Sequence, residues 1–267
     1  MARGAPLGAS HPEVRELRRL LRSRRARDEA AAFVIEGPRV LAAALEHGVE
    51  LERVYAAEAD ADLDVIEQCA ARGVAVLLLA PGVAERVGDT VTPQGVFARG
   101  VLRRAALGAL EGAGFVLVAD RVSDPGNAGT LIRSGAAAGV DAISLGAGSV
   151  DAYNPKVVRA TAGALFAVPI VEGSPTVEIL ERLGTRGVRR VGAVARGGTA
   201  LDDLDLTVPV ALVVGHEVEG LGALPLDALV TIPMAAGAES LNVAMAATVL
   251  CFEAQRQRRA AGSANAP

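Results

Sequence analysis

Aromatic residues are scarce in this chain. Its 267 residues include no tryptophan, two tyrosines and five phenylalanines. Binding of nucleic acid by stacking bases on an exposed aromatic platform is therefore disfavoured. The 51% hydrophobic fraction consists mostly of small and branched residues, which is typical of a soluble α/β protein with a core rich in alanine and valine.

Cysteine and histidine are also rare. Cys69 and Cys251 lie far apart in apolar surroundings, and no Cys-x-x-Cys pair exists, which argues against a disulfide framework and a zinc site. The three histidines, His11, His47 and His216, do not converge into a ligand set. We therefore expect no metal cofactor.

Long apolar runs and the common nucleotide motifs are missing as well. The longest apolar stretches are too short to span a bilayer, and no secretory signal is present, so we expect a cytoplasmic protein. The pair Gly146 and Gly148 is followed by Asp151 where a dinucleotide fingerprint needs glycine, and there is no Walker A sequence. Ser240 does not lie in a Gly-x-Ser-x-Gly elbow.

Positive charge is concentrated near the N-terminus, although the net charge is −4. Seven arginines lie between residues 15 and 27, whereas Lys156 is the one lysine of the chain. Guanidinium groups match phosphate oxygens bidentately, so this segment is a candidate RNA-binding helix. A solvated helix face is the alternative. The residues predicted to bind RNA are Arg18, Arg19, Arg22 and Arg25.

Two α/β series follow one another along the chain, because apolar runs typical of strands alternate with helical patterns. We predict a small domain over 1–104, a linker over 105–114, a second domain over 115–259 and a disordered tail over 260–267. The second series has continuous apolar runs typical of a buried parallel sheet, such as 115–119, 166–170 and 209–215.

Three stretches of the second series break the structural pattern. They are "DRVSDPGNAGTLIRSGAAAG" (120–139), "VVGHEVEGLG" (213–222) and "IPMAAGAESLNVAMAA" (232–247). Each alone is compatible with ordinary turn and cap chemistry. All three follow predicted strands, and ligands of open α/β sheets bind at the carboxyl ends of strands. We therefore expect them to form one site.

The three stretches, in this order and spacing, resemble the three motifs of the SpoU (TrmH-type) branch of the SPOUT superfamily of RNA methyltransferases, over about residues 115–258. The segment "DAYNPKVVRATAGALFAVP" also matches, with Thr161 where serine is more usual. The first domain, with "FVIEGPRVLAAAL" and "TPQGVFARG", is similar to the ribosomal-protein-like substrate-binding domain of many members.

This resemblance implies an α/β fold in which a C-terminal parallel-sheet domain with a deep trefoil knot follows the small α/β domain. It also implies S-adenosylmethionine as cofactor, an RNA substrate and catalysis at a homodimer interface. The reaction implied is methyl transfer to a ribose 2′-hydroxyl. We favour large-subunit (23S) ribosomal RNA over transfer RNA as the substrate.

The same resemblance implies roles for individual residues. Arg133 would orient the target nucleotide and assist deprotonation, although arginine is normally fully protonated. We expect the first motif to begin outside a helix, so that Asn127 and Arg133 can converge. The predicted catalytic residues are Asn127, Arg133, Glu217, Ser240 and Asn242. The predicted cofactor-binding residues are Gly215, Ile232, Met234 and Leu241.

Other functions remain open at this stage. A superfamily member that methylates a base nitrogen would share the fold. A non-catalytic RNA-binding protein would be expected to lack Arg133, Glu217 or Asn242, and all three are present. A small-molecule α/β enzyme would not explain the arginine-rich segment or the first domain.

Overall fold

The computed structural model describes residues 5–88, 94–216 and 218–264 of the chain. It divides into two compact units. The N-terminal unit comprises Met1–Arg103 and Tyr153–Phe166, and the C-terminal unit comprises Arg104–Ala152 and Ala167–Pro267. Each unit has its own sheet, as the two series in the sequence predict. None of the helices described is both long and apolar enough to cross a membrane.

A four-stranded sheet in the order β1-β4-β2-β3 lies at the centre of the N-terminal unit. Strand β4 pairs antiparallel with β1 and β2, whereas β3 pairs parallel with β2. The strands are β1 (Ala32–Glu36), β2 (Leu51–Ala57), β3 (Ala75–Leu79) and β4 (Val96–Val101). The α-helices are α1 (Pro12–Arg22), α2 (Arg24–Ala30), α3 (Pro38–Glu46), α4 (Asp64–Ala71), α5 (Ala84–Val87) and α7 (Pro155–Ala160).

The arginine-rich segment, expected as one helix, folds as α1 and α2, which are separated at Ser23. Helix α1 forms because its apolar residues recur on one helical face. The His11 side chain accepts a hydrogen bond from the Glu13 amide at 3.2 Å, which caps the first turn. Pro12 suits the first turn because its missing amide hydrogen would have no helical partner. The buried residues of α1 are Val14, Leu17, Leu20 and Leu21. The arginines are therefore left on the other faces of the helix.

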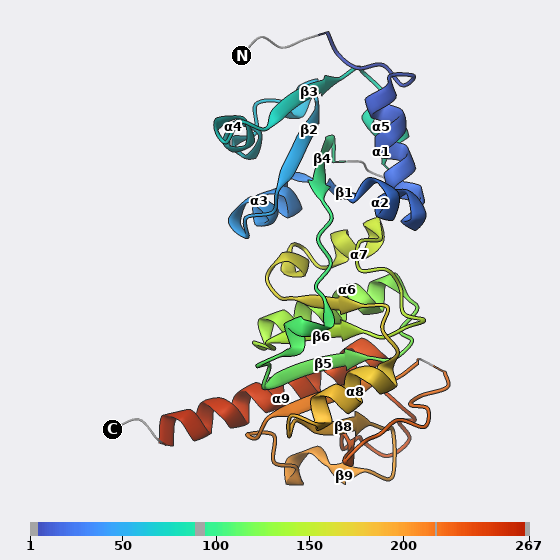
Figure 1. Cartoon of the computed structure of the whole chain (residues 1–267), viewed down its shortest axis with the longest axis vertical. Helices are drawn as coiled ribbons and strands as arrows, with labels where there is room; N and C mark the ends of the chain where they lie inside the picture. The colour runs from blue at the N-terminus through green and yellow to red at the C-terminus, as the bar shows by residue number, and fades with distance from the viewer. Residues whose placement is uncertain (1–4, 89–93, 217, 265–267) are drawn as a thin grey trace. The chain divides into compact units, whose positions relative to one another are not determined.

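The C-terminal unit contains a seven-stranded sheet in the order β7-β6-β5-β10-β8-β11-β9, and every registered pair is parallel. Its strands are β5 (Phe115–Ala119), β6 (Ala142–Leu145), β7 (Ile170–Glu172), β8 (Arg189–Ala193), β9 (Thr199–Ala200), β10 (Val210–Val214) and β11 (Ala228–Thr231). Its α-helices are α6 (Pro125–Ala137), α8 (Thr176–Gly184) and α9 (Val243–Ala264), the long red helix of Figure 1.

Helices cover both faces of this sheet. On one face, Ile179 and Leu183 of α8 pack in a cluster with Val118 and Val213. On the other face lies α6, where Gly135 faces Leu117 and Ile143 closely enough that a Cβ would lie 3.1 Å from each side chain. Helix α9 packs beside α6, and Thr248 donates a hydrogen bond to Ser134 at 2.7 Å. Two covered faces explain why the strands read as continuous apolar runs.

The structure corrects four details of the domain prediction. The predicted linker is packed into the C-terminal unit, since Leu110 is fully buried in its core and Ala105 bridges to Val171. The predicted strand 166–170 begins only at Ile170. Phe166 instead ends a 3₁₀ turn in the N-terminal unit, where its ring centroid lies 6.0 Å from that of Phe33.

The segment Tyr153–Phe166 likewise belongs to the N-terminal unit, although it follows the second-series strand β6. Arg159 of α7 forms a 2.6 Å ion pair with the buried Glu36, which ties this segment to β1. At the chain's end, α9 continues to Ala264, so most of the predicted tail is helical. Alanines at 260 and 261 favour this continuation because alanine is the best helix former.

Candidate active site

The second and third predicted motifs lie at one edge of the parallel sheet. They follow β10 and β11, and the first motif follows β5. Because the strands are parallel, their carboxyl ends share that edge. Strand β10 lies between β5 and β8, so connections leave this point in both directions. Such a switch point in strand order is where open α/β sheets bind ligands.

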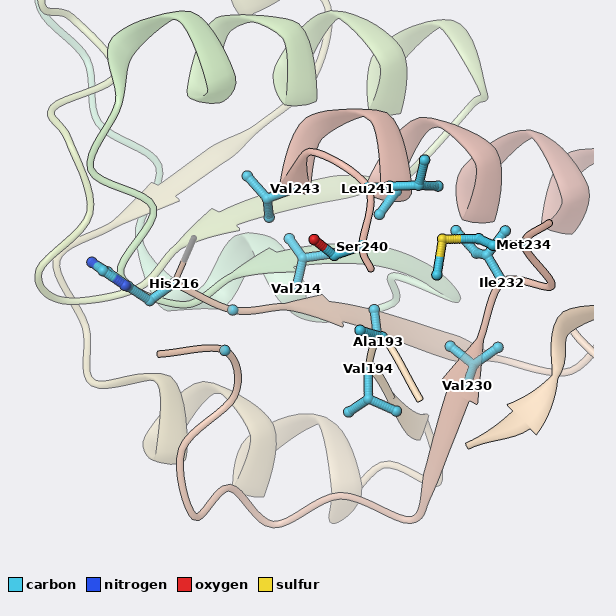
Figure 2. Close-up of a pocket in the computed structure, with 14 residues that line it drawn as sticks. Ala193, Val194, Val214, His216, Val230, Ile232, Met234, Ser240, Leu241 and Val243 are labelled. Atoms are coloured by element: carbon cyan, nitrogen blue, oxygen red, sulfur yellow. The ribbon is translucent and has the colours of Figure 1, made fainter. Parts of the chain in front are cut away.

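A cavity of about 130 Å³ lies at this edge and is partly open to solvent. Figure 2 shows its side chains arranged around a common space, with His216 and Met234 at opposite ends. The lining residues are Ala193, Val194, Ala195, Val214, Gly215, His216, Gly220, Val230, Ile232, Met234, Ser240, Leu241, Val243 and Ala246.

Gly215 brings two backbone segments into direct contact at the end of β10. A Cβ at this position would lie 2.6 Å from the Leu221 amide nitrogen, so a side chain cannot be accommodated without movement of the backbone. His216 and Gly220 exchange two backbone hydrogen bonds, of 3.1 and 2.9 Å. The loop after β10 is thus folded back tightly along the cavity.

All four predicted cofactor-binding residues, Gly215, Ile232, Met234 and Leu241, line this cavity, and Ser240 lines it with them. Sequence reasoning missed the wall formed by Ala193, Val194 and Ala195, which follows β8. The available signal was the end of another apolar parallel strand. Arg196, Gly197 and Gly198 mark that end, but an apolar cavity wall has the same sequence pattern as a core.

Asn127 and Asn242 connect the first motif to the third. The Asn242 side chain donates to Asn127 Oδ1 at 2.9 Å, and its own Oδ1 accepts from the Ala244 and Met245 amides at 2.9 and 3.3 Å. Asn242 therefore caps α9 and fixes its start beside α6.

The first motif begins as a helix, contrary to the sequence-based expectation. Asp124 caps α6 by accepting from the Asn127 amide at 2.7 Å, and Pro125 occupies the first turn. Asn127 and Arg133 thus belong to one regular helix, and six residues correspond to about 600° of rotation, so the two side chains leave it in different directions. The turn chemistry serves to start the helix at the sheet edge.

Arg133 is exposed on α6. Within the described ranges, no hydrogen bond or ion pair to its guanidinium is found. The predicted catalytic residue Glu217 lies outside the described residues. The same parts of the chain contain no cluster of three or more His, Cys, Asp or Glu side chains placed to hold a metal ion.

The arginines predicted to bind RNA fall into two classes. Arg19 forms hydrogen bonds of 2.8 and 3.0 Å to Glu16 and a 3.5 Å contact to Glu29, and Arg25 pairs with Glu29 at 2.7 Å. The guanidinium groups of Arg18 and Arg22, in contrast, make no ion pair with any described residue. Arg27, in the same segment, is buried and donates to the Leu20 carbonyl at 2.6 Å.

Comparisons with known proteins agree with this architecture. The SpoU rRNA Methylase family model matches residues 114–252, and a model of the MRM3-like substrate binding domain matches residues 11–98. The 23S rRNA (guanosine(2553)-2′-O)-methyltransferase RlmP of Bacillus subtilis is 32% identical over 250 residues, 91% of this chain and 96% of that protein.

Two further comparisons involve Streptomyces viridochromogenes. Its 23S rRNA (uridine(2479)-2′-O)-methyltransferase is 31% identical over 268 residues, 93% of this chain and 91% of that protein. The crystal structure of its SpoU methyltransferase AviRb, in complex with the cofactor AdoMet, superimposes with a TM-score of 0.84 at 29% identity, covering 93% of this chain and 98% of that one. The chain therefore belongs to the SpoU rRNA methylase family.

Proposed function

We propose that this protein transfers a methyl group from S-adenosylmethionine to a ribose 2′-hydroxyl of 23S ribosomal RNA. The observation that carries the proposal is the cavity at the carboxyl edge of the parallel sheet, lined by residues of the second and third motifs. The first motif is hydrogen-bonded to the third beside it. Relatives that match nearly the whole chain are named for this reaction on 23S rRNA.

The lining of the cavity suits the proposed cofactor. Apolar side chains such as Val214, Ile232 and Leu241 form walls suited to the flat face of an adenine ring. Gly215 leaves no side chain between the backbone and the cavity, so backbone groups after β10 can approach the ligand closely. When bound, S-adenosylmethionine supplies an electrophilic methyl group on its sulfonium sulfur. The knotted chain path that the resemblance implies for this region stays a prediction.

The chain's own residues would position and activate the hydroxyl. A ribose hydroxyl is a weak nucleophile near neutral pH, so orientation and easier loss of its proton both lower the barrier. We assign Arg133 to hold the RNA near its target hydroxyl by charge and hydrogen bonding. Asn127 and Asn242 keep α6 and α9 in register, and Ser240 lies at the cavity for contact with substrate. Glu217 is retained as a proposed catalytic residue.

A homodimer would complete this site. Helix α9 and Leu241, two residues before its start, expose an apolar stripe at spacings of four, four and three residues, and such spacing marks one helical face. The stripe comprises Leu241, Met245, Val249 and Phe252, each at least 40% exposed. Leu241 also lines the cavity, so a second copy packed on this stripe would lie next to the proposed cofactor. We further propose that the protein acts in the cytoplasm, where ribosomes are.

The test is transfer of radiolabelled methyl from S-adenosylmethionine to 23S rRNA, 16S rRNA and transfer RNA that lack prior modification, followed by nucleoside analysis. We expect one 2′-O-methylated nucleoside, from 23S rRNA. The relatives named above act on a guanosine and a uridine, so the nucleotide itself is an outcome of the experiment. A product in transfer RNA would contradict the substrate, a methylated base would contradict the reaction, and no transfer to any pool would contradict the enzyme.

A further inference from the structure

Arg121 has an unusual backbone conformation directly after β5. Its φ angle is +56°, in the left-handed region that favours glycine. Non-glycine residues persist there only where their surroundings hold them, and such residues cluster at functional sites. Arg121 lies in the first stretch but does not line the cavity and has no predicted site role, so its conformation needs a separate explanation.

The Arg121 guanidinium joins a buried anchor to the loop after β10. Its Nε donates to Asp120 Oδ2 at 3.0 Å, and Asp120 is itself 5% exposed and accepts from Thr176 Oγ1 at 2.6 Å. On the other side, Nη1 pairs with the Glu219 carboxylate, and Nη2 lies 3.5 Å from the Gly220 carbonyl. The hydrogen bonds to Asp120 and Glu219, in that order, raise the pKa of Arg121 and keep it cationic.

The space that the side chain needs is provided by Gly148. A Cβ at Gly148 would lie 3.1 Å from Arg121 Cγ, tighter than ordinary van der Waals contact. The left-handed backbone at Arg121 and the missing side chain at Gly148 together let the guanidinium cross from the end of β5 to the loop after β10. Neither feature is needed for a simple strand-to-helix connection.

The far end of this bridge is a wall of the cavity. Gly220 lines the cavity and is hydrogen-bonded to His216, which lines it too. The His216 ring reinforces the loop, since its Nδ1 accepts from the Val218 and Glu219 amides, each at 3.2 Å. Displacement of Glu219 or Gly220 would therefore move two lining residues.

We propose that Arg121 is a positioning residue that clamps the loop Val218–Gly222 against the cofactor cavity through Glu219 and Gly220. The proposal rests on the proposed cofactor site. The clamp holds the loop in its binding conformation before the ligand arrives, so the ordering cost on binding is reduced. Because its outer half is an ion pair near the surface, its strength should fall as ionic strength rises.

Two variants test the clamp. Arg121→Gly removes the guanidinium but tolerates the positive φ, so any effect comes from the lost contacts and not from a new backbone strain. Glu219→Gln removes the charge at the loop. Glu111→Gln is the matched control, because Glu111 pairs with Arg182 at 2.7 Å with similar exposure and neither residue lines the cavity.

Two readouts are needed. The first is amide hydrogen exchange over Val218–Gly222 in the protein without ligand, where we expect exchange about threefold faster or more in both clamp variants and unchanged in Glu111→Gln. The second is calorimetric affinity for S-adenosylmethionine, where we expect about tenfold weaker binding for Arg121→Gly and about threefold for Glu219→Gln. The double variant should be no weaker than Arg121→Gly alone, because both changes break one interaction.

Additive effects in the double variant, or unchanged loop exchange in Arg121→Gly, would overturn the clamp. A general loss of folding is recognised by a matching fall in the melting temperature, which Glu219→Gln should leave within the range of Glu111→Gln. If the unaltered protein bound no S-adenosylmethionine, the proposed function would fail, while the exchange experiment would still decide whether Arg121 holds the loop.

Discussion

The two units of this protein present different kinds of surface for their proposed tasks. The site in the C-terminal unit is built from small apolar side chains and exposed backbone at the ends of β8, β10 and β11. The candidate RNA surface in the N-terminal unit consists of arginine side chains on the consecutive helices α1 and α2. Cofactor binding in the cavity depends on its shape to within about an ångström, whereas RNA binding on the arginine surface depends on how many guanidinium groups lack acidic partners. Substitutions should therefore act in different ways on the two units.

Loss of Arg133 should have the largest effect. We expect Arg133→Ala to lower the rate of methyl transfer by about 10²–10⁴-fold, the range for removal of a group that assists proton transfer or stabilises charge. Affinity for S-adenosylmethionine should stay nearly unchanged, because Arg133 does not line the cavity. Single-turnover methyl transfer and calorimetry measure the two quantities, and an equal loss of both would reassign Arg133 to the cofactor pocket or the fold.

Gly215→Ala should show the opposite pattern in the same unit. The added methyl group would collide with the backbone at Gly220 and Leu221, so the loop after β10 must move. We expect binding of S-adenosylmethionine to weaken by about tenfold or more, since backbone rearrangements of this kind typically cost 1–3 kcal/mol. Unchanged affinity in calorimetry would show that Gly215 is not a wall of the cofactor site.

The arginines of the N-terminal unit should show a smaller, salt-dependent effect. In Arg18→Ala/Arg22→Ala we expect the slope of log affinity for RNA against log salt to fall by about two, because each lost phosphate contact removes about one. In the matched variant Arg19→Ala/Arg25→Ala the slope should change less, because Glu16 and Glu29 already pair with these guanidiniums.

Filter binding or fluorescence anisotropy with 23S rRNA fragments at several salt concentrations measures these slopes. Equal changes in the two variants would mean that the ion pairs open on binding and that both arginine classes contact RNA. No change in either would identify α1 as a solvated helix face, the alternative that the sequence leaves open.

More of the geometry could be predicted from the sequence in the C-terminal unit than in the N-terminal unit, for a physical reason. Polar and glycine residues after apolar strands stand out, so Gly215 and Ser240 could be assigned to one edge of a parallel sheet, whereas Leu241 was implied by the family resemblance. The pairing of Arg19 with Glu29 depends on how α1 and α2 fold back on each other across ten residues. No local pattern specifies such a contact.

The misjudged details have equally local causes. The first motif was expected to begin outside a helix, but Pro125, after the capping Asp124, starts α6. Ala193–Ala195 could not be distinguished from core residues. Leu110 lies in a segment rich in glycine and alanine that has no apolar period, yet it is fully buried because Ala105 docks the segment beside β7.

The smallest expected effect is a difference in local stability between the two units. It can be measured through the reactivity of their buried cysteines, without any substitution in the proposed site. Cys69 lies in α4 and Cys251 in α9, and both are fully buried. Burial raises the pKa of both thiols, that of Cys251 to about 12. The raised pKa keeps the Cys251 thiol protonated at pH 8 in the folded protein, so labelling requires local opening.

We expect a maleimide to label Cys69 faster than Cys251. The unit that contains Cys69 has a four-stranded sheet, whereas the unit that contains Cys251 has a larger sheet of seven parallel strands and should open less often. The raised pKa of Cys251 also fixes a pH dependence. Its contribution to the free energy of unfolding is fully present below the ordinary thiol pKa of about 9 and is lost as pH rises through 12. Maleimide labelling in increasing urea, followed by mass spectrometry, gives the labelling rates of Cys69 and Cys251. Equal rates at every urea concentration would mean that the two units open as one, and the contrast between them would then hold for their surfaces but not for their stability.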